Sequence, residues 1–429
     1  MDGKLVEKMD GKRLFASAYG HFSIDILNSS LPVILTAVAA SFNLNVSQIG
    51  LAAMIYTFAA SLTQPLFGIL VDKFRGRWIA GLGLVWTMLF YALAPFMPNY
   101  YALVTCLSLG ALGSGAFHPA GMVNATMAGG SKPTTATSLF FVGGQVGLAV
   151  GPTAAGVLLQ NFGLTALPYM ALIMTPAALF MLWFLRRPYA DVPPAKPKAA
   201  TTTAATASPG RGSNKGLYIV LAFVLLITFR STTQQGFTTL LPKFFADQGY
   251  TPAVYGMMLS VLGLAGATGT FIGGWLGDRF NRRMVILISM TLGALFSSAM
   301  LRTDGWTYAV VALGAGIMMN IPHSILIIMA QRLIPARKAM IGGAVLGLMF
   351  ASGAATTGLG SWIADYTGLP VVLSVFALLP IAAGLSALML PSTRGSEAAV
   401  DVTRTDVNQV DATAEAKSAQ DTATSTAGD

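Results

Sequence analysis

Residues 68–77 read GILVDKFRGR, and residues 274–283 read GWLGDRFNRR. In both stretches a glycine comes four residues before an aspartate, and Lys or Arg follows the aspartate directly. The two aspartates, Asp72 and Asp278, lie 206 positions apart. A motif repeated at such a distance predicts that the chain consists of two related halves.

A second landmark repeats at nearly the same distance. His118 precedes Pro119, His323 follows Pro322, and the two histidines lie 205 positions apart. Two independent landmarks at nearly one offset are hard to explain by chance, and parallel repeats of this kind are a transporter architecture.

The composition is that of a membrane protein. Of the 429 residues, 54% are hydrophobic and only 10% are charged, whereas a soluble domain carries about 25% charged residues. The net charge of +9 does not indicate a nucleic-acid partner, because the basic residues fall in short clusters between apolar runs. The single cysteine, Cys106, excludes a disulfide within the chain.

Twelve apolar runs are long enough to cross a bilayer, which takes about 20 residues of α-helix. We therefore expect an all-α integral membrane protein with about twelve transmembrane helices in two six-helix bundles. The expected spans are residues 15–40, 47–71, 77–97, 100–123, 134–159, 166–186, 216–242, 252–276, 284–301, 306–331, 339–363 and 369–391.

The segments outside these spans set the expected domain boundaries. Residues 1–14 form a cytoplasmic lead, and residues 15–187 form the first bundle. Residues 188–215, rich in Pro, Ala and Thr, are expected to be a flexible cytoplasmic linker. Residues 216–391 form the second bundle, and the polar residues 392–429 are expected to be a disordered cytoplasmic tail.

The basic residues predict the orientation. Of the 26 Lys and Arg residues, all but three lie in segments that would share one side of the membrane. The exceptions are Arg230, inside a span, and Lys243 and Arg302. Because cytoplasmic segments carry the excess of Lys and Arg, we expect both termini to be cytoplasmic and the chain to lie in the cytoplasmic (inner) membrane.

The repeated loops are candidates for conformational gating. An aspartate at a helix end can pair with a neighbouring Arg or a helix N-terminus, and a glycine permits close helix contact. Such a cluster could hold two helices together in one conformation and release them in another; the alternative is an ordinary basic loop. The candidate gating residues are Gly68, Asp72, Arg75, Arg77, Gly274, Asp278 and Arg282.

These loops resemble the signature of the major facilitator superfamily, and the resemblance covers residues 15–391. It implies the major-facilitator fold, in which two six-helix bundles surround a central cavity that opens alternately to each side of the membrane. In that superfamily the first, fourth, seventh and tenth helices line the cavity.

Few ionisable residues lie inside the expected spans: His21, Asp25, His118, Arg230 and His323. Ionisable groups inside a bilayer are costly and by default functional. All five fall on the helices that the resemblance places around the cavity, where transport chemistry would occur.

His21 and Asp25 are the candidates for proton coupling. They lie four residues apart, so they share a helix face and can hydrogen-bond. A carboxylate beside an imidazole can take up and release a proton near neutral pH. The alternative is a structural hydrogen bond that only orients the first helix.

Arg230 is the candidate anchor for an anionic substrate, because a guanidinium does not readily lose its charge. The alternative is a structural ion pair with Asp25, the acid expected within its reach. The candidate substrate-binding residues are Arg230, His118, His323, Gln145 and Asn320.

Residues 143–156 read GGQVGLAVGPTAAG. Glycines at this spacing let helices approach closely, and a proline beside them kinks a helix. The pattern resembles the antiporter motif of exporters in the same superfamily and favours efflux, while plain helix packing is the alternative. The motif residues are Gly147, Gly151, Pro152 and Gly156.

Within the superfamily the chain looks most similar to the fosmidomycin-resistance-type exporters. HFSID (residues 21–25), GSGAFHP (residues 113–119) and SLFFVGG (residues 138–144) carry this similarity. That family typically has an acidic residue after His-Pro, where this chain has Ala120. If that acid couples protons in the family, Asp25 is the nearby group that must do so here.

We therefore expect a secondary active transporter that exports a small anionic or amphiphilic, antibiotic-like compound by proton-coupled alternating access. Proton-driven uptake of an organic anion is the alternative, and a non-transporting receptor or scaffold is a third. No nucleophile–base pair, phosphate loop or metal-ligand cluster points to an enzyme, and neither a cofactor nor a metal is expected. The expected partners are the substrate, protons and the lipid bilayer but no nucleic acid, and the chain is expected to be monomeric.

Overall fold

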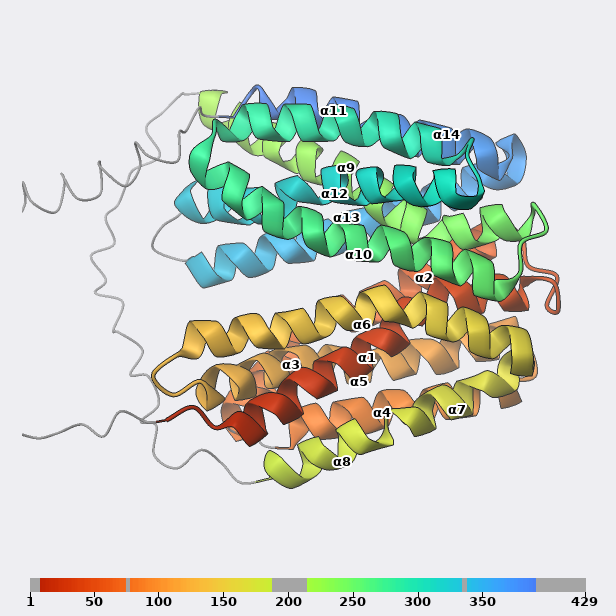
Figure 1. Cartoon of the computed structure of the whole chain (residues 1–429), viewed down its shortest axis with the longest axis vertical. Coiled ribbons are helices and arrows are strands. Elements are labelled where there is room, and N and C mark those ends of the chain that lie inside the picture. The colour runs from red at the N-terminus through yellow and green to blue at the C-terminus, as the bar shows by residue number, and fades with distance from the viewer. Residues whose placement is uncertain (1–7, 75–77, 187–213, 334–337, 391–429) are drawn as a thin grey trace, which may run out of the picture.

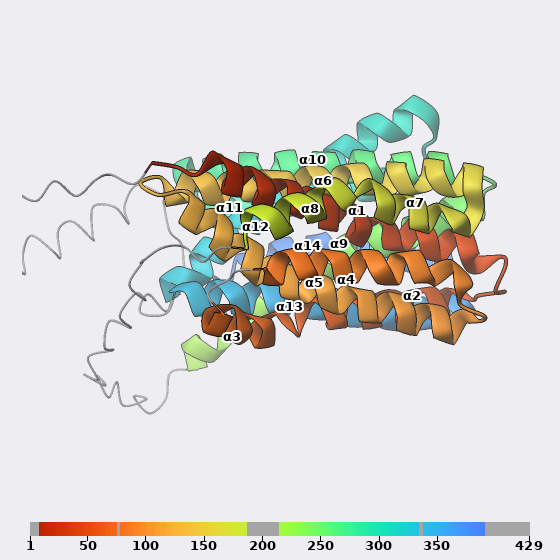
Figure 2. The ribbon, with the colours of Figure 1, turned by 90° about the horizontal axis from the view of Figure 1, so that it is seen from below.

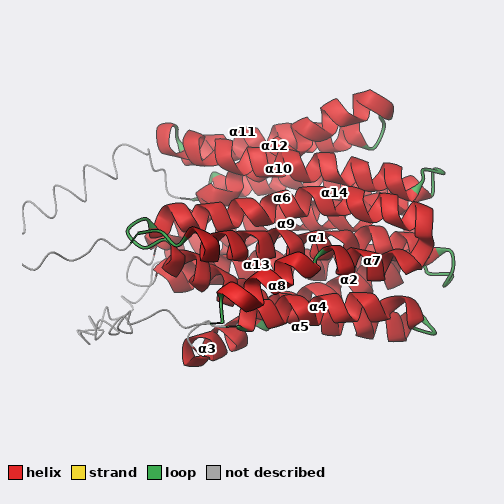
Figure 3. Ribbon diagram, turned by 60° about the horizontal axis from the view of Figure 1, so that its bottom comes forward, coloured by secondary structure: helices red, strands yellow, loops and turns green. Residues whose placement is uncertain are grey.

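A computed structural model of the chain describes residues 8–74, 78–186, 214–333 and 338–390. Within these residues the regular elements are α-helices and two short 3-10 helices, and there is no strand (Figure 3). The prediction of an all-α fold is therefore confirmed.

The helices of the first half are α1 (Gly11–Ala39), α2 (Val46–Ser61), α3 (Gln64–Phe74), α4 (Ile79–Leu93), α5 (Tyr100–Ala128), α6 (Pro133–Phe162), α7 (Ala166–Ile173) and α8 (Thr175–Phe184), with η1 (Ala94–Phe96) and η2 (Gly163–Thr165) between them. The helices of the second half are α9 (Asn214–Ala246), α10 (Pro252–Arg279), α11 (Arg282–Met300), α12 (Gly305–Leu333), α13 (Lys338–Thr367) and α14 (Leu369–Ala387). The expected tail and nearly all of the expected linker lie outside the described residues.

Eleven stretches of the described residues are long and apolar enough to cross a membrane. One of them, Thr135–Phe184, has 50 residues and covers α6, α7 and α8. That stretch is long enough to cross twice, which brings the number of crossings to the twelve that the sequence predicts.

Two expected spans are broken into two helices each. The span 47–71 is interrupted between α2 and α3, where Pro65 follows the break, and the span 166–186 is interrupted at Met174, two residues before Pro176. A proline lacks a backbone N–H and can begin a helix but not continue one without a break or kink. Apolar runs alone do not reveal such breaks.

Several helix ends have identifiable causes. Asn45 caps α2 and forms a capping box with Gln48, which satisfies two of the N–H groups that a helix start leaves free. The side chain of Asn99 caps α5. Gly163 after α6 and Gly368 before α14 have positive φ angles of 56° and 87°, a conformation that glycine adopts at little cost.

The outer surface carries many large apolar side chains. Among the most exposed are Phe271, Trp306 and Tyr366, with relative exposures of 82%, 79% and 75%. Side chains of this kind spread over a surface are unfavourable in water and favourable against lipid. The exposed apolar surface therefore agrees with a chain that crosses the membrane many times.

Among the described residues, the two halves share an apolar core toward one end of the molecule. At the end where α1 leads into α2 and α13 into α14, one cluster of buried apolar residues includes side chains from both halves, such as Leu35 and Leu373. Toward the end where the chain enters α1, the buried apolar residues form two separate clusters, one within each half. We call the end with the shared cluster the closed end and the end with the separate clusters the terminal end. The ribbons of the two halves diverge toward the terminal end, at the left of Figure 1, and Figure 2 gives the view from below.

Candidate functional site

The first half brings Asp25 between two histidines. On α1, His21 Nε2 lies 3.2 Å from Asp25 Oδ2, and His118 Nε2, from α5, lies 3.4 Å from Asp25 Oδ1. The side chains of His21 and Asp25 are only 5% and 7% exposed, whereas that of His118 is 26% exposed. We call these three residues the triad. The His21–Asp25 contact was predicted from the sequence; the approach of His118 was not.

Main-chain carbonyl groups fix how both imidazoles are oriented. His21 Nδ1 lies 2.8 Å from the carbonyl oxygen of Phe140, and His118 Nδ1 lies 2.8 Å from that of Ser114. A carbonyl oxygen only accepts, so each Nδ1 carries the proton and donates it. In a neutral imidazole Nε2 then bears a lone pair, and both lone pairs face the carboxylate of Asp25.

A chain of hydrogen bonds supports Asp25 from the other side. Asn28 donates from Nδ2 to Asp25 Oδ1 at 3.0 Å and to Ser114 Oγ at 2.9 Å. Tyr56 donates to Asn28 Oδ1 at 2.8 Å and lies 3.5 Å from the hydroxyl of Tyr91. Sequence reasoning missed these residues because Asn, Ser and Tyr carry no charge that would mark them within an apolar span.

Helix α6 covers the triad. The ring of Phe140 stacks on that of His21 with centroids 4.0 Å apart. A Cβ atom at Gly144 would lie 2.5 Å from His21 Nε2 and 2.8 Å from Asp25 Oδ2. Only glycine at position 144 therefore lets the main chain of α6 lie this close to the triad.

In the second half, Arg230 on α9 is buried, with 3% exposure. Its Nε donates to the carbonyl oxygen of Met319 and its Nη2 to Asn320 Oδ1, both at 3.1 Å. Among the described residues Arg230 forms no ion pair, and Asp25, its expected partner, contacts His21 and His118 instead. The ion pair considered for Arg230 is therefore absent from this conformation, and the remaining guanidinium N–H groups have no protein acceptor within the described chain.

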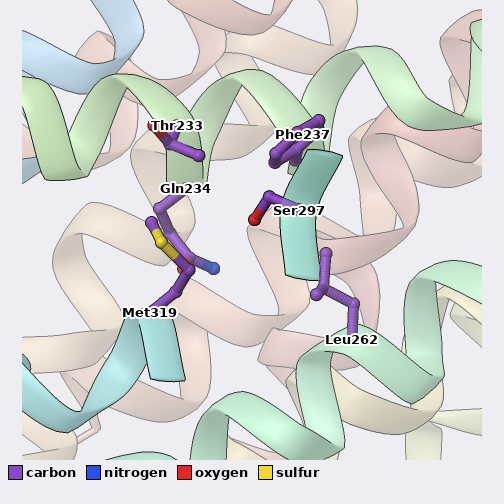
Figure 4. A pocket seen from close by; sticks show the side chains of 6 residues that line it. All are labelled: Thr233, Gln234, Phe237, Leu262, Ser297 and Met319. Carbon is purple, nitrogen blue, oxygen red and sulfur yellow. The ribbon is translucent and has the colours of Figure 1, made fainter. Parts of the chain in front are cut away.

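The contacts of Arg230 continue to a small cavity. Asn320 donates from Nδ2 to Gln234 Oε1 at 3.1 Å, and Gln234 lines the cavity together with Met319 and Ser297 (Figure 4). The cavity has a volume of about 10 Å³, which is close to the minimum for one water molecule. Ser297 Oγ is buried without a hydrogen-bond partner in the described chain, so a water here would satisfy it.

Asp25 and Arg230 occupy equivalent positions of the two halves. They lie 205 positions apart, as His118 and His323 do. His118 contacts Asp25, whereas His323 is half-buried and makes no hydrogen bond among the described residues. Each half thus presents one buried charge from its first helix, negative in one half and positive in the other.

The remaining predicted site residues are placed apart from these two clusters. Gln145 is exposed on α6, next to Gly144, and makes no hydrogen bond among the described residues. Asp72 is exposed at the terminal end, and its predicted partners Arg75 and Arg77 lie outside the described residues. No ion pair of Asp72 is found within the described chain, so its gating role stays a prediction.

The second gating loop is more fully described. Asp278 is 75% exposed at its side chain, while Arg282 is buried and lies 4.0 Å from it. Arg282 Nε donates to the carbonyl oxygen of Gly277 at 3.0 Å. A Cβ atom at Gly68 or Gly274 would meet no described residue within 4 Å, so the expected close contact of these glycines is not seen among the described residues and their gating role stays a prediction.

The glycines of the predicted antiporter motif pack against α1 and α10. Cβ atoms at Gly147 and Gly151 would collide with the carbonyl oxygens of Phe22 and Ile26 on α1. A Cβ atom at Gly156 would collide with the carbonyl oxygen of Pro252 on α10. One face of α6 therefore binds its own half, and the end of the same helix binds the other half.

Two hydrogen-bonded caps join the halves at the closed end. At the end of α6, Gln160 Oε1 accepts a hydrogen bond of 3.2 Å from the main-chain N–H of Ala253 at the start of α10. At the end of α13, Asp365 Oδ1 accepts from the main-chain N–H groups of Val46 and Ser47 at the start of α2, at 2.9 and 3.3 Å. Gln160 and Asp365 lie 205 positions apart, so the two inter-half caps are equivalent under the repeat, and the repeat offset is the sequence signal that links them.

The triad is also the group of described residues with the donor set of a metal site. The ligand atoms that His21, Asp25 and His118 offer all lie within 4.8 Å of one another. The sequence predicted no metal site, because His118 lies 93 positions from Asp25.

Comparison with known proteins identifies relatives along nearly the whole chain. The family model described as "Major Facilitator Superfamily" matches residues 16–251 and again residues 223–413. The chain is 29% identical over 384 residues to an uncharacterized MFS-type transporter, YfnC, of Bacillus subtilis, covering 87% of this chain and 91% of that protein. It is 27% identical over 386 residues to the fosmidomycin resistance protein of Escherichia coli, covering 89% and 93%.

Solved structures agree with the fold. A bacterial homologue of the human lysosomal transporter Spinster, in an inward-facing and occupied conformation, superimposes with a TM-score of 0.70 at 13% identity. The superposition covers 88% of this chain and 95% of the homologue. At that identity the match supports the arrangement of helices and nothing finer.

Proposed function

Because this chain belongs to the major facilitator superfamily, whose members are membrane transporters and not enzymes, we propose that it is a proton-coupled exporter of a small anionic or amphiphilic compound. The observation that carries the proton coupling and the anion recognition is the pair of buried, opposite charges at equivalent positions of the two halves. The Asp25 triad would carry protons, and Arg230 would hold the anion.

The triad supports proton coupling by its hydrogen bonds. Since both Nδ1 atoms donate to carbonyl oxygens, each contact between Nε2 and Asp25 is repulsive until a proton lies in it. The triad therefore gains stability on taking up protons and has donors and acceptors in place to release them again. The partial exposure of His118 provides a path for exchange.

Arg230 supports recognition of an anion. A buried cation without a counter-charge is costly, and its unused N–H groups match the paired oxygens of a phosphonate or carboxylate. Its two acceptors, a carbonyl and an amide oxygen, orient the guanidinium without neutralising it. An anion would supply the missing charge.

Alternating access is supported by the asymmetry between the two ends. The distribution of Lys and Arg favours cytoplasmic termini, so the terminal end would face the cytoplasm and the closed end the outside. This conformation would then receive substrate from the cytoplasm, as an exporter requires, and the monomer contains all the parts of the proposed site.

Export is the preferred direction because a curated relative is named for fosmidomycin resistance and because the glycine motif of α6 resembles that of exporters. Proton-driven uptake is the second candidate, and electrostatics favours it. A proton on the triad and an anion on Arg230 each reduce the cost of the other's charge, so each promotes the binding of the other. Joint binding is the behaviour of a symporter, whereas an exchanger requires competition.

The direction of proton flow decides between them. Purified protein in liposomes that contain a pH-sensitive dye is given a phosphonate, first fosmidomycin, on one side without an imposed gradient. Proton movement opposite to the phosphonate supports the exporter, and movement in the same direction supports uptake. Phosphonate transport without any proton movement would contradict the proposal.

A further inference from the structure

The facing lone pairs of the triad can be satisfied in two ways. A proton can lie in each contact between histidine and Asp25, as in the proposed function, or one cation can be shared by all three side chains. We propose that the triad of His21, Asp25 and His118 is a binding site for a divalent transition-metal ion of the zinc class, which excludes the protons when it is bound.

The distances fit such an ion. Zinc binds histidine nitrogen and carboxylate oxygen at about 2.0–2.2 Å, and two ligands of a tetrahedral ion at that range lie about 3.3 Å apart. His21 Nε2 and His118 Nε2 lie 3.2 and 3.4 Å from the two different oxygens of the Asp25 carboxylate, and the ligand atoms of the three side chains lie within 4.8 Å of one another.

The surroundings are those of a metal site as well. Histidines that bind metals almost always donate their other N–H to a carbonyl or carboxylate, and the ligating carboxylate is itself hydrogen-bonded. Here both Nδ1 atoms donate to carbonyl oxygens, and Asn28 donates to Asp25. These contacts hold the lone pairs on Nε2 toward the shared position before any ion arrives.

The donor set indicates which ion binds. Two imidazoles and one carboxylate suit zinc, cobalt or nickel, whereas magnesium and calcium prefer oxygen ligands. Three protein ligands also leave a fourth position for water or for an oxygen of a bound anion. Entry is possible beside His118, the most exposed member of the triad.

The test uses full-length protein purified without a polyhistidine tag and stripped with a chelator. Cobalt is titrated while its visible absorption is recorded, and zinc is titrated by calorimetry. Wild type is expected to bind one ion of each but not magnesium, and His118→Gln is expected to lose binding by about a hundredfold or more, beyond the range for supporting residues. Asn28→Ala, which removes only a supporting contact, is expected to lose about tenfold.

His323→Gln is the matched control, because the chain has three histidines and His323 is the one outside the triad. It should bind the ion as wild type does, and zinc should raise the unfolding temperature of both proteins but not that of His118→Gln. Absence of binding by wild type, or equal binding by His118→Gln, would overturn the inference. If wild type binds no zinc but transports in response to a gradient, the inference fails and the proposed function stands. If wild type binds zinc but shows no gradient-driven transport, the proposed function fails and the inference stands.

Discussion

Two buried charges at equivalent positions are held in different ways. Asp25 receives a hydrogen bond from Asn28 and faces two imidazoles, so its charge can be compensated by protons within its own half. Among the residues that the structure describes, the acceptors of Arg230 are a carbonyl and an amide oxygen. Its charge therefore has to be compensated from outside the second half, which is the physical basis for assigning it to the substrate.

Replacement of Arg230 tests that assignment. Arg230→Gln is expected to weaken phosphonate binding by about tenfold to a hundredfold, since a hydrogen bond to a charged group contributes about 1.5–3 kcal/mol. Arg230→Lys should keep part of the affinity, because lysine keeps the charge but not the planar fork. Arg302→Gln is the control, since Arg302 is exposed just after the end of α11 and donates to the carbonyl oxygen of Ser298. Equilibrium binding of labelled fosmidomycin is measured for wild type and the three variants. If Arg230→Gln binds with wild-type affinity, Arg230 is a structural residue and does not hold the substrate.

Gly144 tests whether the close cover of the triad matters. Gly144→Ala would place a Cβ atom 2.5 Å from His21 Nε2, so the side chain or α6 must shift, at a cost of about 1–3 kcal/mol. We expect a lower unfolding temperature and a loss of gradient-driven transport. Gly347→Ala is the matched control, because a Cβ atom there would meet no described residue within 4 Å. If the two variants behave alike in both measurements, α6 does not constrain the triad.

For single residues, the sequence predicts which buried side chains are ionisable better than it predicts which of them are in contact. His21 and Asp25 could be paired because four residues make one turn of helix. His118 could not, since its approach depends on how α5 packs against α1. The 205-residue offset, applied to Asp25, points to Arg230 as its counterpart from residue numbers alone.

Among the elements, α6 has the most connected position. Its glycines lie against α1 along the first half, and its last turns lie against α10 of the second half. Movement of the halves relative to each other therefore changes contacts on the same helix that covers the triad. This gives the site and the closed end a common structural element.

The two inter-half caps should stabilise closure at that end. Asp365→Ala is expected to shift the conformational equilibrium away from closure by about twofold to fivefold, the effect of a charge at a helix N-terminus. Gln160→Ala should shift it in the same direction. Asp304→Ala is the control, since Asp304 is an exposed acid whose side chain makes no hydrogen bond among the described residues.

Distances between spin labels at exposed positions 101 and 306, measured after Cys106→Ser, report the opening of the closed end. A larger population of long distances in the two cap variants, but not in Asp304→Ala, is expected. Unchanged distance distributions in both cap variants would mean that apolar packing alone closes this end.

The glycine pattern of α6 predicted close packing but not the partners, because spacing along one helix does not reveal which helix lies opposite. For Gly68 and Gly274 the described part of the chain offers no partner within 4 Å of a Cβ atom, so the same argument identifies no contact there. Their loops lie at the terminal end, where the halves do not share a core. A contact that forms only in another conformation leaves no trace here.

At the scale of the whole molecule, composition and length predicted the class of fold because twelve apolar runs admit few arrangements in a bilayer. The state of opening could not be predicted in this way. In the proposed alternating-access cycle one sequence has to stabilise both conformations within a few kcal/mol, so residue patterns alone do not favour one of them. The shared core at the closed end and the separate cores at the terminal end are what distinguish the state described here.

The central claim is that protons on Asp25 drive the movement of an anion held by Arg230. The most direct test is transport of labelled fosmidomycin by proteoliposomes under pH gradients of both signs, with wild type and Asp25→Asn compared at equal protein content. The account predicts that reversal of the gradient reverses net transport by wild type. It also predicts that Asp25→Asn still exchanges labelled for unlabelled compound but no longer responds to the gradient, because the asparagine cannot carry the proton. Full gradient-driven transport by Asp25→Asn would contradict the account.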